Sequence, residues 1–118
     1  METRDLTDLV QFFPDRPRAE TLFETDRLWS QLVCLDRGQA LGPITDQSAD
    51  GLFAVVAGEV VIQVSRSRKR LRQWATVLVP AGDEVTVTNA SADPAVVLIV
   101  AAPPPARRPG VEPDGAAG

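Results

Sequence analysis

The sequence predicts an all-β fold, a small antiparallel β-barrel of the jelly-roll type with a short N-terminal helix. Short apolar segments alternate with clusters of Gly, Pro, Asn and Asp at even intervals, as in β-sandwiches and barrels. No stretch between Leu28 and Ala102 has a sustained helical periodicity. The length of 118 residues, with 44% hydrophobic and 24% charged residues, fits one compact domain.

The N-terminal segment is expected to form a short amphipathic helix over Thr3 to Phe13. Its apolar residues have the spacing of one helical face, at Leu6, Leu9, Val10 and Phe13. Pro14 follows at once and cannot continue a helix, because it has no backbone N–H to donate. Residues 1–18 are therefore interpreted as a helix with its connector, and residues 19–102 as the barrel.

Strands are expected wherever an apolar segment is bounded by turn residues. The predicted strands are Glu20 to Glu24, Leu28 to Leu35, Leu52 to Ala57, Val60 to Ser65, Thr76 to Val79, Glu84 to Asn89 and Ala95 to Ala101. The strand from Leu28 to Leu35 is apolar at odd and even positions alike. Its periodicity therefore does not show which face, that of Gln31 or that of Cys34, turns inward.

A basic run separates two of these strands. It contains five of the twelve cationic residues of the chain, Arg66, Arg68, Lys69, Arg70 and Arg72. The run has no aromatic residue on which a nucleic-acid base could stack, and it lies between two apolar segments. We therefore interpret it as a solvated hairpin loop.

The segment from residue 103 to residue 118 is expected to be a disordered tail rich in Pro, Gly and Ala. Val111 is its only sizeable aliphatic residue. Such a segment buries too little apolar surface to offset the entropy lost on ordering. We assign it no function.

Charge and cysteine content limit the partners and the compartment. A net charge of −4 disfavours binding to nucleic acid or to an anionic membrane. No apolar run approaches the roughly 20 residues that cross a bilayer, and the N-terminus lacks the layout of a signal peptide. The single Cys34 cannot form an internal disulfide. A cytoplasmic protein is expected.

Two segments resemble the paired sequence motifs of the cupin family, which are small antiparallel β-barrels. The first segment runs from Gly38 to Gly58 and the second from Trp74 to Asn89. The residues that match the scaffold positions of the motifs are Gly38, Gly58, Pro80, Gly82 and Asn89. The resemblance covers roughly Ala19 to Ala102 and implies the cupin barrel. Trp74 stands where a glycine usually opens the second motif. Because a positive φ strains an indole-bearing residue, a different backbone conformation is expected there.

The metal-binding residues of these motifs are missing, and the chain has no histidine. In the register fixed by the glycines, the two histidines of the first motif fall on Ile44 and Asp46, its glutamate on Gly51, and the histidine of the second motif on Val85. A divalent transition metal needs three or four N, O or S donors at one point. We therefore expect neither a metal nor another cofactor.

The residues at and beside those positions define a predicted interior. Side chains alternate between the two faces of a strand, so Val87 is expected on the same inward side as Val85, and Phe53 and Val55 on the same inward side as Gly51. The same alternation suggests that Asp83 also points inward. The candidate ligand-binding residues are Ile44, Gly51, Phe53, Val55, Trp74, Val85 and Val87. A packed core and a pocket for an apolar small molecule are both compatible with this lining. Gly51 in place of a glutamate leaves volume that favours a pocket.

Function is predicted as binding of an apolar small molecule in a metal-free barrel. The first alternative is a cofactor-independent cyclase or isomerase of a bacterial biosynthetic pathway, with Asp46 as the catalytic acid or base at a pKa raised by burial. Cys34 could act as a nucleophile only beside a base or a cation, and is more simply a buried apolar residue. The second alternative is a non-catalytic structural or regulatory module. A homodimer is expected, because exposed strand edges favour pairing between subunits.

Overall fold

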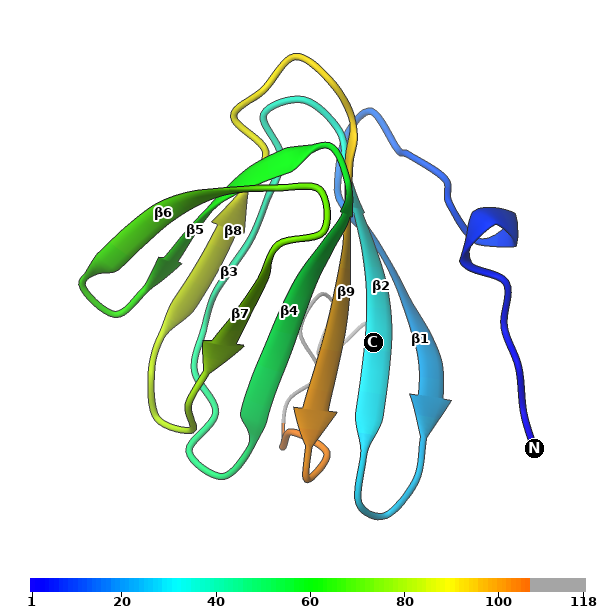
Figure 1. The fold of residues 1–118 in the computed structure, drawn as a ribbon, viewed down its shortest axis with the longest axis vertical. Helices are drawn as coiled ribbons and strands as arrows, with labels where there is room; N and C mark the ends of the chain where they lie inside the picture. The colour runs from blue at the N-terminus through cyan, green and yellow to red at the C-terminus, as the bar shows by residue number, and fades with distance from the viewer. Residues whose placement is uncertain (107–118) are drawn as a thin grey trace.

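The computed structural model describes residues 1–106 as two antiparallel β-sheets packed face to face (Figure 1). One sheet has the strand order β1-β2-β9-β4-β7 and the other the order β3-β8-β5-β6. The strands are β1 Arg18–Glu24, β2 Trp29–Leu35, β3 Ala40–Ile44, β4 Asp50–Ala57, β5 Glu59–Val64, β6 Ser67–Arg72, β7 Thr76–Val79, β8 Val85–Thr88 and β9 Ala95–Ala102. The predicted all-β jelly-roll fold is confirmed.

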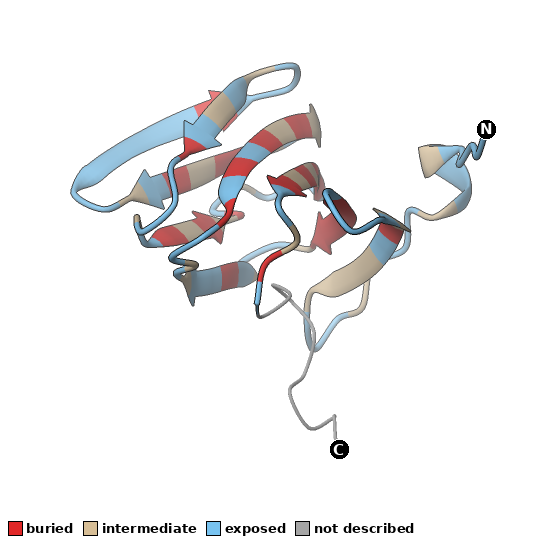
Figure 2. Cartoon of the chain, turned by 90° about the horizontal axis from the view of Figure 1, so that it is seen from below, coloured by how far each residue is buried: buried red, intermediate tan, exposed pale blue. Residues whose placement is uncertain are grey.

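The main core lies between the two sheets. Buried and less buried residues alternate along most strands, which appear banded in Figure 2. In β4, Phe53 and Val55 face the core while Leu52 faces outward and is 43% exposed. This alternation is the one expected for antiparallel strands with one face on the core.

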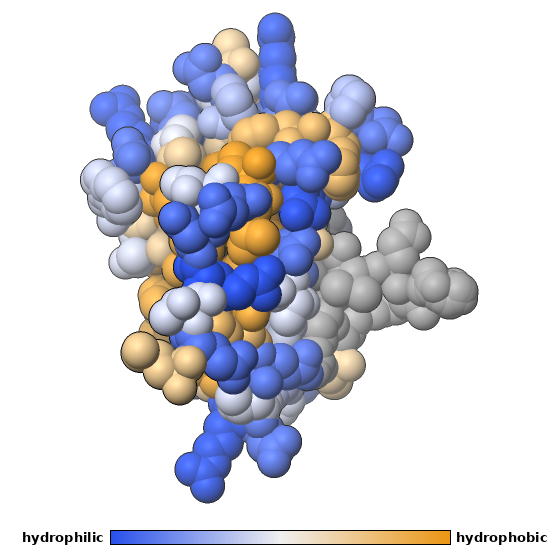
Figure 3. Space-filling view, turned by 90° about the vertical axis from the view of Figure 1, so that its right-hand side faces the viewer, coloured by the Kyte–Doolittle hydropathy of each residue, from blue (hydrophilic) through white to orange (hydrophobic). Residues whose placement is uncertain are grey.

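The two faces of β2 are both buried, which explains why its sequence is apolar on both parities. Trp29, Val33 and Leu35 face the main core. Leu32 and Cys34 belong to a second apolar cluster on the outer face of the sheet, where the N-terminal segment packs through Leu6, Leu9 and Phe12. Figure 3 views the molecule from the side of β1 and this segment, where apolar surface appears between charged side chains.

The predicted short N-terminal helix is present, but it covers only a small part of residues 3–13. The structure has only a 3₁₀ turn, η1, over Leu6–Asp8, capped by the Asp5 side chain, which accepts a hydrogen bond from the N–H of Thr7. A helix of about ten residues is marginal by itself. The apolar side chains of this segment are instead buried by lying against the sheet.

Two strands were not predicted. β3 contains Gly42-Pro43, which interrupts the strand pattern, and β3 is an edge strand, where proline is tolerated. The basic run is not a hairpin loop, because most of it forms β6, paired with β5 from Glu59↔Arg72 to Val64↔Ser67. Charged side chains are tolerated there because β6 is also an edge strand, and only its Leu71 is buried.

Both the backbone conformation and the close packing at position 58 require a glycine. Its φ is +73°, and a Cβ atom there would lie 2.4 Å from the carbonyl oxygen of Pro94.

Trp74 adopts a φ of +77°, so the expectation that its backbone avoids the glycine conformation is wrong. Its N–H donates a hydrogen bond of 2.7 Å to the carbonyl of Val55, and its side chain is 77% exposed.

No helix in residues 1–106 is long and apolar enough to cross a membrane.

Candidate functional site

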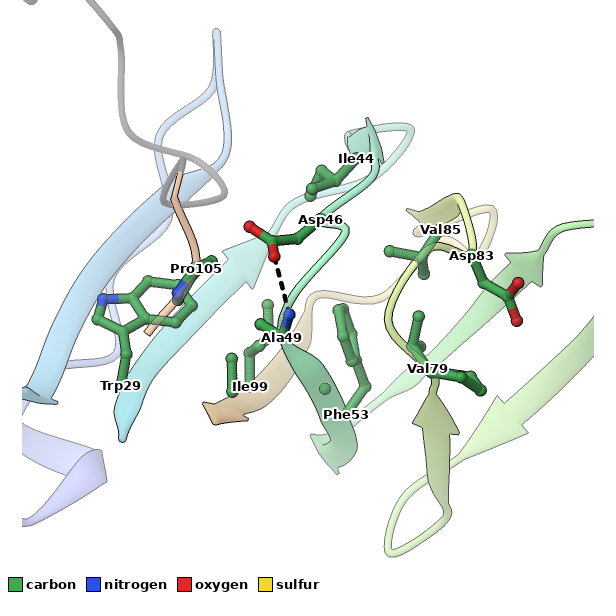
Figure 4. Close-up of a pocket in the computed structure, with 13 residues that line it drawn as sticks. Trp29, Ile44, Asp46, Ala49, Phe53, Val79, Asp83, Val85, Ile99 and Pro105 are labelled. Carbon is green, nitrogen blue, oxygen red and sulfur yellow. Dashed lines mark hydrogen bonds between the residues drawn. The ribbon is translucent and has the colours of Figure 1, made fainter. Parts of the chain in front are cut away.

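The candidate site is an apolar pocket at the mouth of the barrel, at the end where β4 begins and β9 ends (Figure 4). Five of the residues predicted from the sequence line it, namely Ile44, Asp46, Gly51, Phe53 and Val85. The other apolar walls were not predicted from the sequence and are formed by Trp29, Ala49, Val79, Pro80, Ile99, Ala101 and Pro105. Asp83, which strand alternation places on the inward side, also lines the pocket.

Three predicted ligand-binding residues lie elsewhere. Val55 and Val87 are buried in the core and do not line the pocket. Trp74 lies in the turn between β6 and β7 with its side chain in solvent, so its expected place beside the interior is corrected. The motif position of Trp74 did not determine where its side chain points, because a positive φ turns the side chain away from the direction expected in a strand.

The pocket is small, with a cavity volume of about 40 Å³. That is room for about three water molecules, at roughly 10–15 Å³ for each. Gly51 does not leave an open space, because a Cβ atom on Gly51 would lie 3.1 Å from Cε1 of Phe53. The Phe53 ring therefore fills most of the volume that a larger side chain at Gly51 would occupy.

Asp46 forms the centre of a hydrogen-bonded loop between β3 and β4. Its Oδ1 accepts hydrogen bonds from the N–H of Ser48 at 2.9 Å, the hydroxyl of Ser48 at 3.0 Å and the N–H of Ala49 at 2.8 Å. Its backbone carbonyl accepts a hydrogen bond of 2.7 Å from the N–H of Gly82. The loop thereby holds the turn between β7 and β8 beside the pocket.

The electrostatics of Asp46 oppose the predicted acid role. Partial burial acts to raise the pKa of this carboxyl, but the hydrogen bonds from Ser48, Ala106 and Ala49 outweigh it and leave the pKa below its usual value. Asp46 is therefore ionised at neutral pH and a weak base. The expectation of a raised pKa is wrong, because the carboxylate caps a turn rather than lying among apolar groups alone.

A C-terminal strap, which we define as residues 103–106, closes part of the mouth. Pro105 lines the pocket, and the N–H of Ala106 donates a hydrogen bond of 2.8 Å to Oδ2 of Asp46. The pairing of β4 with β9, with Asp50 opposite Ala102, brings the end of β9 beside the Asp46 loop. The predicted disordered tail is thus corrected for residues 103–106, and residues 107–118 lie outside the described residues.

Trp29 is the largest side chain of the pocket that sequence reasoning missed. It is fully buried at the base of the strap, and Figure 4 draws its ring beside Pro105. Its indole Nε1 has no hydrogen-bond partner among residues 1–106. A buried donor in this state is costly unless a polar atom reaches it.

Cys34 lies on the other side of the sheet from the pocket, in the cluster with Leu22, Leu32 and Val96. Burial raises the pKa of its thiol, against smaller opposite effects from the backbone of Gln11 and the charge of Arg18. A protonated, buried thiol is a poor nucleophile, so Cys34 acts as an apolar packing residue.

The residues at the motif's ligand positions do not fit a transition metal. Ile44, Gly51 and Val85 carry no side-chain donor atom, and Asp46 is engaged in the hydrogen bonds described above. Among the side chains of residues 1–106, no three of His, Cys, Asp or Glu gather as a metal-ligand group. The donors present at the mouth therefore do not make a transition-metal site.

Solved structures similar to this chain support the architecture. Protein TT1209 from Thermus thermophilus is 32% identical, with a TM-score of 0.85, over 89% of this chain and all of that one. A double-stranded β-helix protein from Klebsiella pneumoniae has a TM-score of 0.81 at 15% identity, over 87% and 90% of the two chains. A cupin superfamily protein from Desulfitobacterium hafniense has a TM-score of 0.69 at 18% identity, over 80% and 84%. No protein-family model and no curated protein matches the sequence.

Proposed function

We propose that this chain, which has the fold of the cupins, uses that barrel, without a metal, to bind an apolar small molecule at the mouth. The observation that carries the proposal is the lining of the pocket, where aromatic and aliphatic side chains from both sheets surround a cavity next to Trp29 and Phe53. Concave apolar sites with few polar groups are the usual binding sites of small molecules.

Binding requires the mouth to enlarge. The cavity of about 40 Å³ is far below the roughly 300–1,000 Å³ of typical ligand sites. Pro105 is a wall that can move, because it belongs to no strand, but the hydrogen bond from its neighbour Ala106 to Asp46 has to break for it to do so. A ligand that displaces the strap would gain contact with Trp29 and Ile99.

Catalysis is a weaker candidate than binding. Asp46 is the only residue assigned a catalytic role, and its carboxylate is already engaged in turn and strap hydrogen bonds. A cyclase or isomerase on this barrel would therefore act by holding its substrate in a reactive shape rather than by proton transfer at Asp46.

The test uses the buried tryptophan as the reporter. Trp74→Phe leaves Trp29 as the only tryptophan, since the chain has two. Titration with N-phenyl-1-naphthylamine, a neutral apolar fluorophore, should quench Trp29 saturably and brighten the probe. Ala101→Leu, which fills the pocket, should weaken this binding at least about tenfold, and Ala102→Leu, on the exposed face of the same strand, should not.

Each alternative result has a defined meaning. Binding that is unchanged by EDTA supports the metal-free site, and binding that disappears with EDTA overturns it. Absence of saturable quenching overturns the apolar pocket as a binding site. Thermal unfolding of both alanine-to-leucine variants checks that they are folded.

We also propose a homodimer through the outer face of the five-stranded sheet. Beyond the exposed Asp50 at the start of β4, six outward positions of β4, β7 and the adjoining part of β9 form an uncharged patch, namely Leu52, Ala54, Thr76, Leu78, Leu98 and Val100. Leu52 and Leu78 are directly paired and are 43% and 64% exposed. An uncharged patch is complementary to a copy of itself under two-fold symmetry.

Sedimentation should show a dimer that Leu78→Glu converts to a monomer, while Arg70→Glu, on the other sheet, leaves the dimer intact. A monomeric wild-type protein would refute this interface.

A further inference from the structure

The strand β6 is a free edge of the barrel. It ends the four-stranded sheet, and β7, which follows it in the chain after a short turn, ends the other sheet (Figure 1). Within residues 1–106, β6 pairs with β5 alone. The backbone on the other side of β6 is therefore available to a further strand.

The register of the β5–β6 hairpin shows which backbone groups face this free edge. A two-residue turn joins the strands, so the closing pair Val64↔Ser67 exchanges hydrogen bonds. Hydrogen-bonded and non-hydrogen-bonded pairs alternate along an antiparallel ladder, and Arg68 and Arg70 fall in non-hydrogen-bonded pairs. The N–H and C=O groups of both arginines therefore point away from β5, toward the free edge.

Three arginines form a row along the outer face of β6. Arg68 lies opposite the exposed Gln63, so its side chain is on the outer face of the sheet. Side chains alternate along a strand, so Arg70 and Arg72 share that face while Lys69 is on the inner face. Alternate residues of a strand are roughly 6.6–6.8 Å apart, which gives the row a regular spacing.

This hairpin is basic in an acidic chain. Residues 59–72 contain five cations and one carboxylate, a net charge of +4 in a chain whose net charge is −4. The carboxylate, Glu59, forms an ion pair with Arg70. In the part of the chain that the structure describes, the side chains of Arg68 and Arg72 form no ion pair or hydrogen bond. The row is therefore only partly neutralised by the protein.

The inner side of the same edge is apolar. A groove of about 520 Å³ lies between β6 and β7, and its walls include Ile62, Val64 and Val77. A strand added along β6 would turn every second side chain toward this groove and the others toward the arginine row.

We propose that β6 binds an extended segment of a partner protein in which acidic and apolar residues alternate, added to the sheet as an antiparallel strand. Its acidic side chains lie opposite Arg68 and Arg70, and its apolar side chains lie over the groove. In strand addition, main-chain hydrogen bonds give affinity and the alternate side chains give specificity. The inference concerns a protein partner and does not rest on the ligand proposed for the mouth.

Charge and backbone geometry favour this occupant over two others. A second copy of the chain, paired through β6 about a two-fold axis, would place arginine opposite arginine, and like charges directly opposite destabilise a sheet. A nucleic acid would find no aromatic residue in β6 on which its bases could stack. It would also leave the N–H and C=O groups of the edge without a strand partner.

The experiment measures the binding of fluorescein-labelled peptides to the full-length protein by fluorescence anisotropy. An alternating Glu-Val octapeptide should bind saturably. A peptide with the same residues in two blocks, all Glu before all Val, should bind at least about tenfold more weakly. In hydrogen exchange followed by NMR, the alternating peptide should slow the amides of Arg68 and Arg70, because their N–H groups become hydrogen-bonded.

N-methylation of the peptide separates strand pairing from charge. Antiparallel pairing directs the N–H groups of the glutamates, which lie opposite the arginines, toward β6. Methylation of the central glutamate nitrogens should therefore abolish binding. Methylation of the central valine nitrogens, which point away from β6, should leave binding nearly unchanged. The methylated peptides carry the same charge as the parent.

Two double variants test the arginine row. Arg68→Gln/Arg70→Gln should weaken binding of the alternating peptide about tenfold. Arg66→Gln/Lys69→Gln is the matched control, because it removes two charges from the turn and the inner face of the same hairpin. This control should change the affinity by about twofold at most. Thermal unfolding checks that both variants are folded.

Every other result overturns the proposal. Absence of saturable binding shows that the arginines only protect an edge strand from aggregation. Equal binding of the alternating and block peptides, or equal losses in the two double variants, shows a general charge effect. Tighter binding of a single-stranded oligonucleotide than of the alternating peptide refutes a protein partner. None of these results bears on the binding of the apolar probe at the mouth.

Discussion

The carboxylate of Asp46 accepts a hydrogen bond of 2.8 Å from the backbone N–H of Ala106, sixty positions further along the chain. Its other oxygen is already bonded to Ser48 and Ala49 in its own loop. One side chain thus connects the loop between β3 and β4 to the strap that carries Pro105 over the pocket. Access to the pocket is therefore linked to the state of Asp46.

The substitution Asp46→Asn should release the strap. A side-chain amide has one acceptor oxygen, so it could keep the bonds to Ser48 and Ala49 or the bond to Ala106, and not both. We expect a loss of about 1 kcal/mol in stability and faster association of N-phenyl-1-naphthylamine, measured by thermal unfolding and stopped-flow fluorescence. An unchanged association rate would show that the strap does not limit entry.

The stability that Asp46 provides should depend on pH. Its folded-state pKa is lowered from an unfolded value of about 3.9, so its contribution is fully present above that value. It is lost as the pH falls through the lower folded-state pKa. Denaturant unfolding of the wild type and of Asp46→Asn should therefore differ by a constant amount above about pH 5 and converge in stronger acid. A difference that grows as the solution becomes more acidic would contradict the hydrogen-bond origin.

Two glycines of the first motif should respond differently to alanine. Gly38 has a φ of +78° and no atom within 4 Å of a Cβ, so Gly38→Ala should cost about 1–2 kcal/mol from backbone strain alone. Gly58→Ala adds a Cβ at 2.4 Å from the Pro94 oxygen and should cost about 1–3 kcal/mol more. Equilibrium unfolding in urea measures both, and equal losses would contradict the clash.

Asn89 should not tolerate an isosteric acid. Its buried Nδ2 donates to the carbonyls of Leu35 and Asp93 at 2.9 and 2.8 Å, and its Oδ1 accepts two bonds from Ser91. Asn89→Asp places a carboxylate against two carbonyl oxygens, so a loss of about 3–5 kcal/mol is expected at neutral pH. Protonation restores one donor, so the loss in unfolding free energy should shrink in acid. A pH-independent loss would argue against this repulsion.

The Phe53 ring should control the size of the pocket. Phe53→Ala removes the side chain that fills the space beside Gly51, at an expected cost of about 3–5 kcal/mol. If the variant remains folded, it should bind N-phenyl-1-naphthylamine more tightly than the wild type. Phe53→Leu is the milder variant for comparison, and its smaller cavity should give an intermediate affinity.

The sequence was informative wherever a residue's role is local. Gly58 and Asn89 could be recognised from their motif positions, because a positive φ and a turn that needs an amide impose a residue type at a single site. Most strands could be recognised from alternation and turn residues. The N-terminal helix is shorter than the predicted residues 3–13, because the apolar side chains of this segment are buried by contact with β1 and β2 without further helical turns.

The sequence by itself determined a barrel of short antiparallel strands without donors at most of the motif's metal positions, since these properties depend on residue type and spacing. Only the tertiary structure decided that Trp29 faces the pocket and that Ala106 binds Asp46. Each of these depends on contacts between segments far apart in the chain, such as the pairing of Asp50 with Ala102. Such pairing follows from the packing of the whole chain, and no local periodicity encodes it.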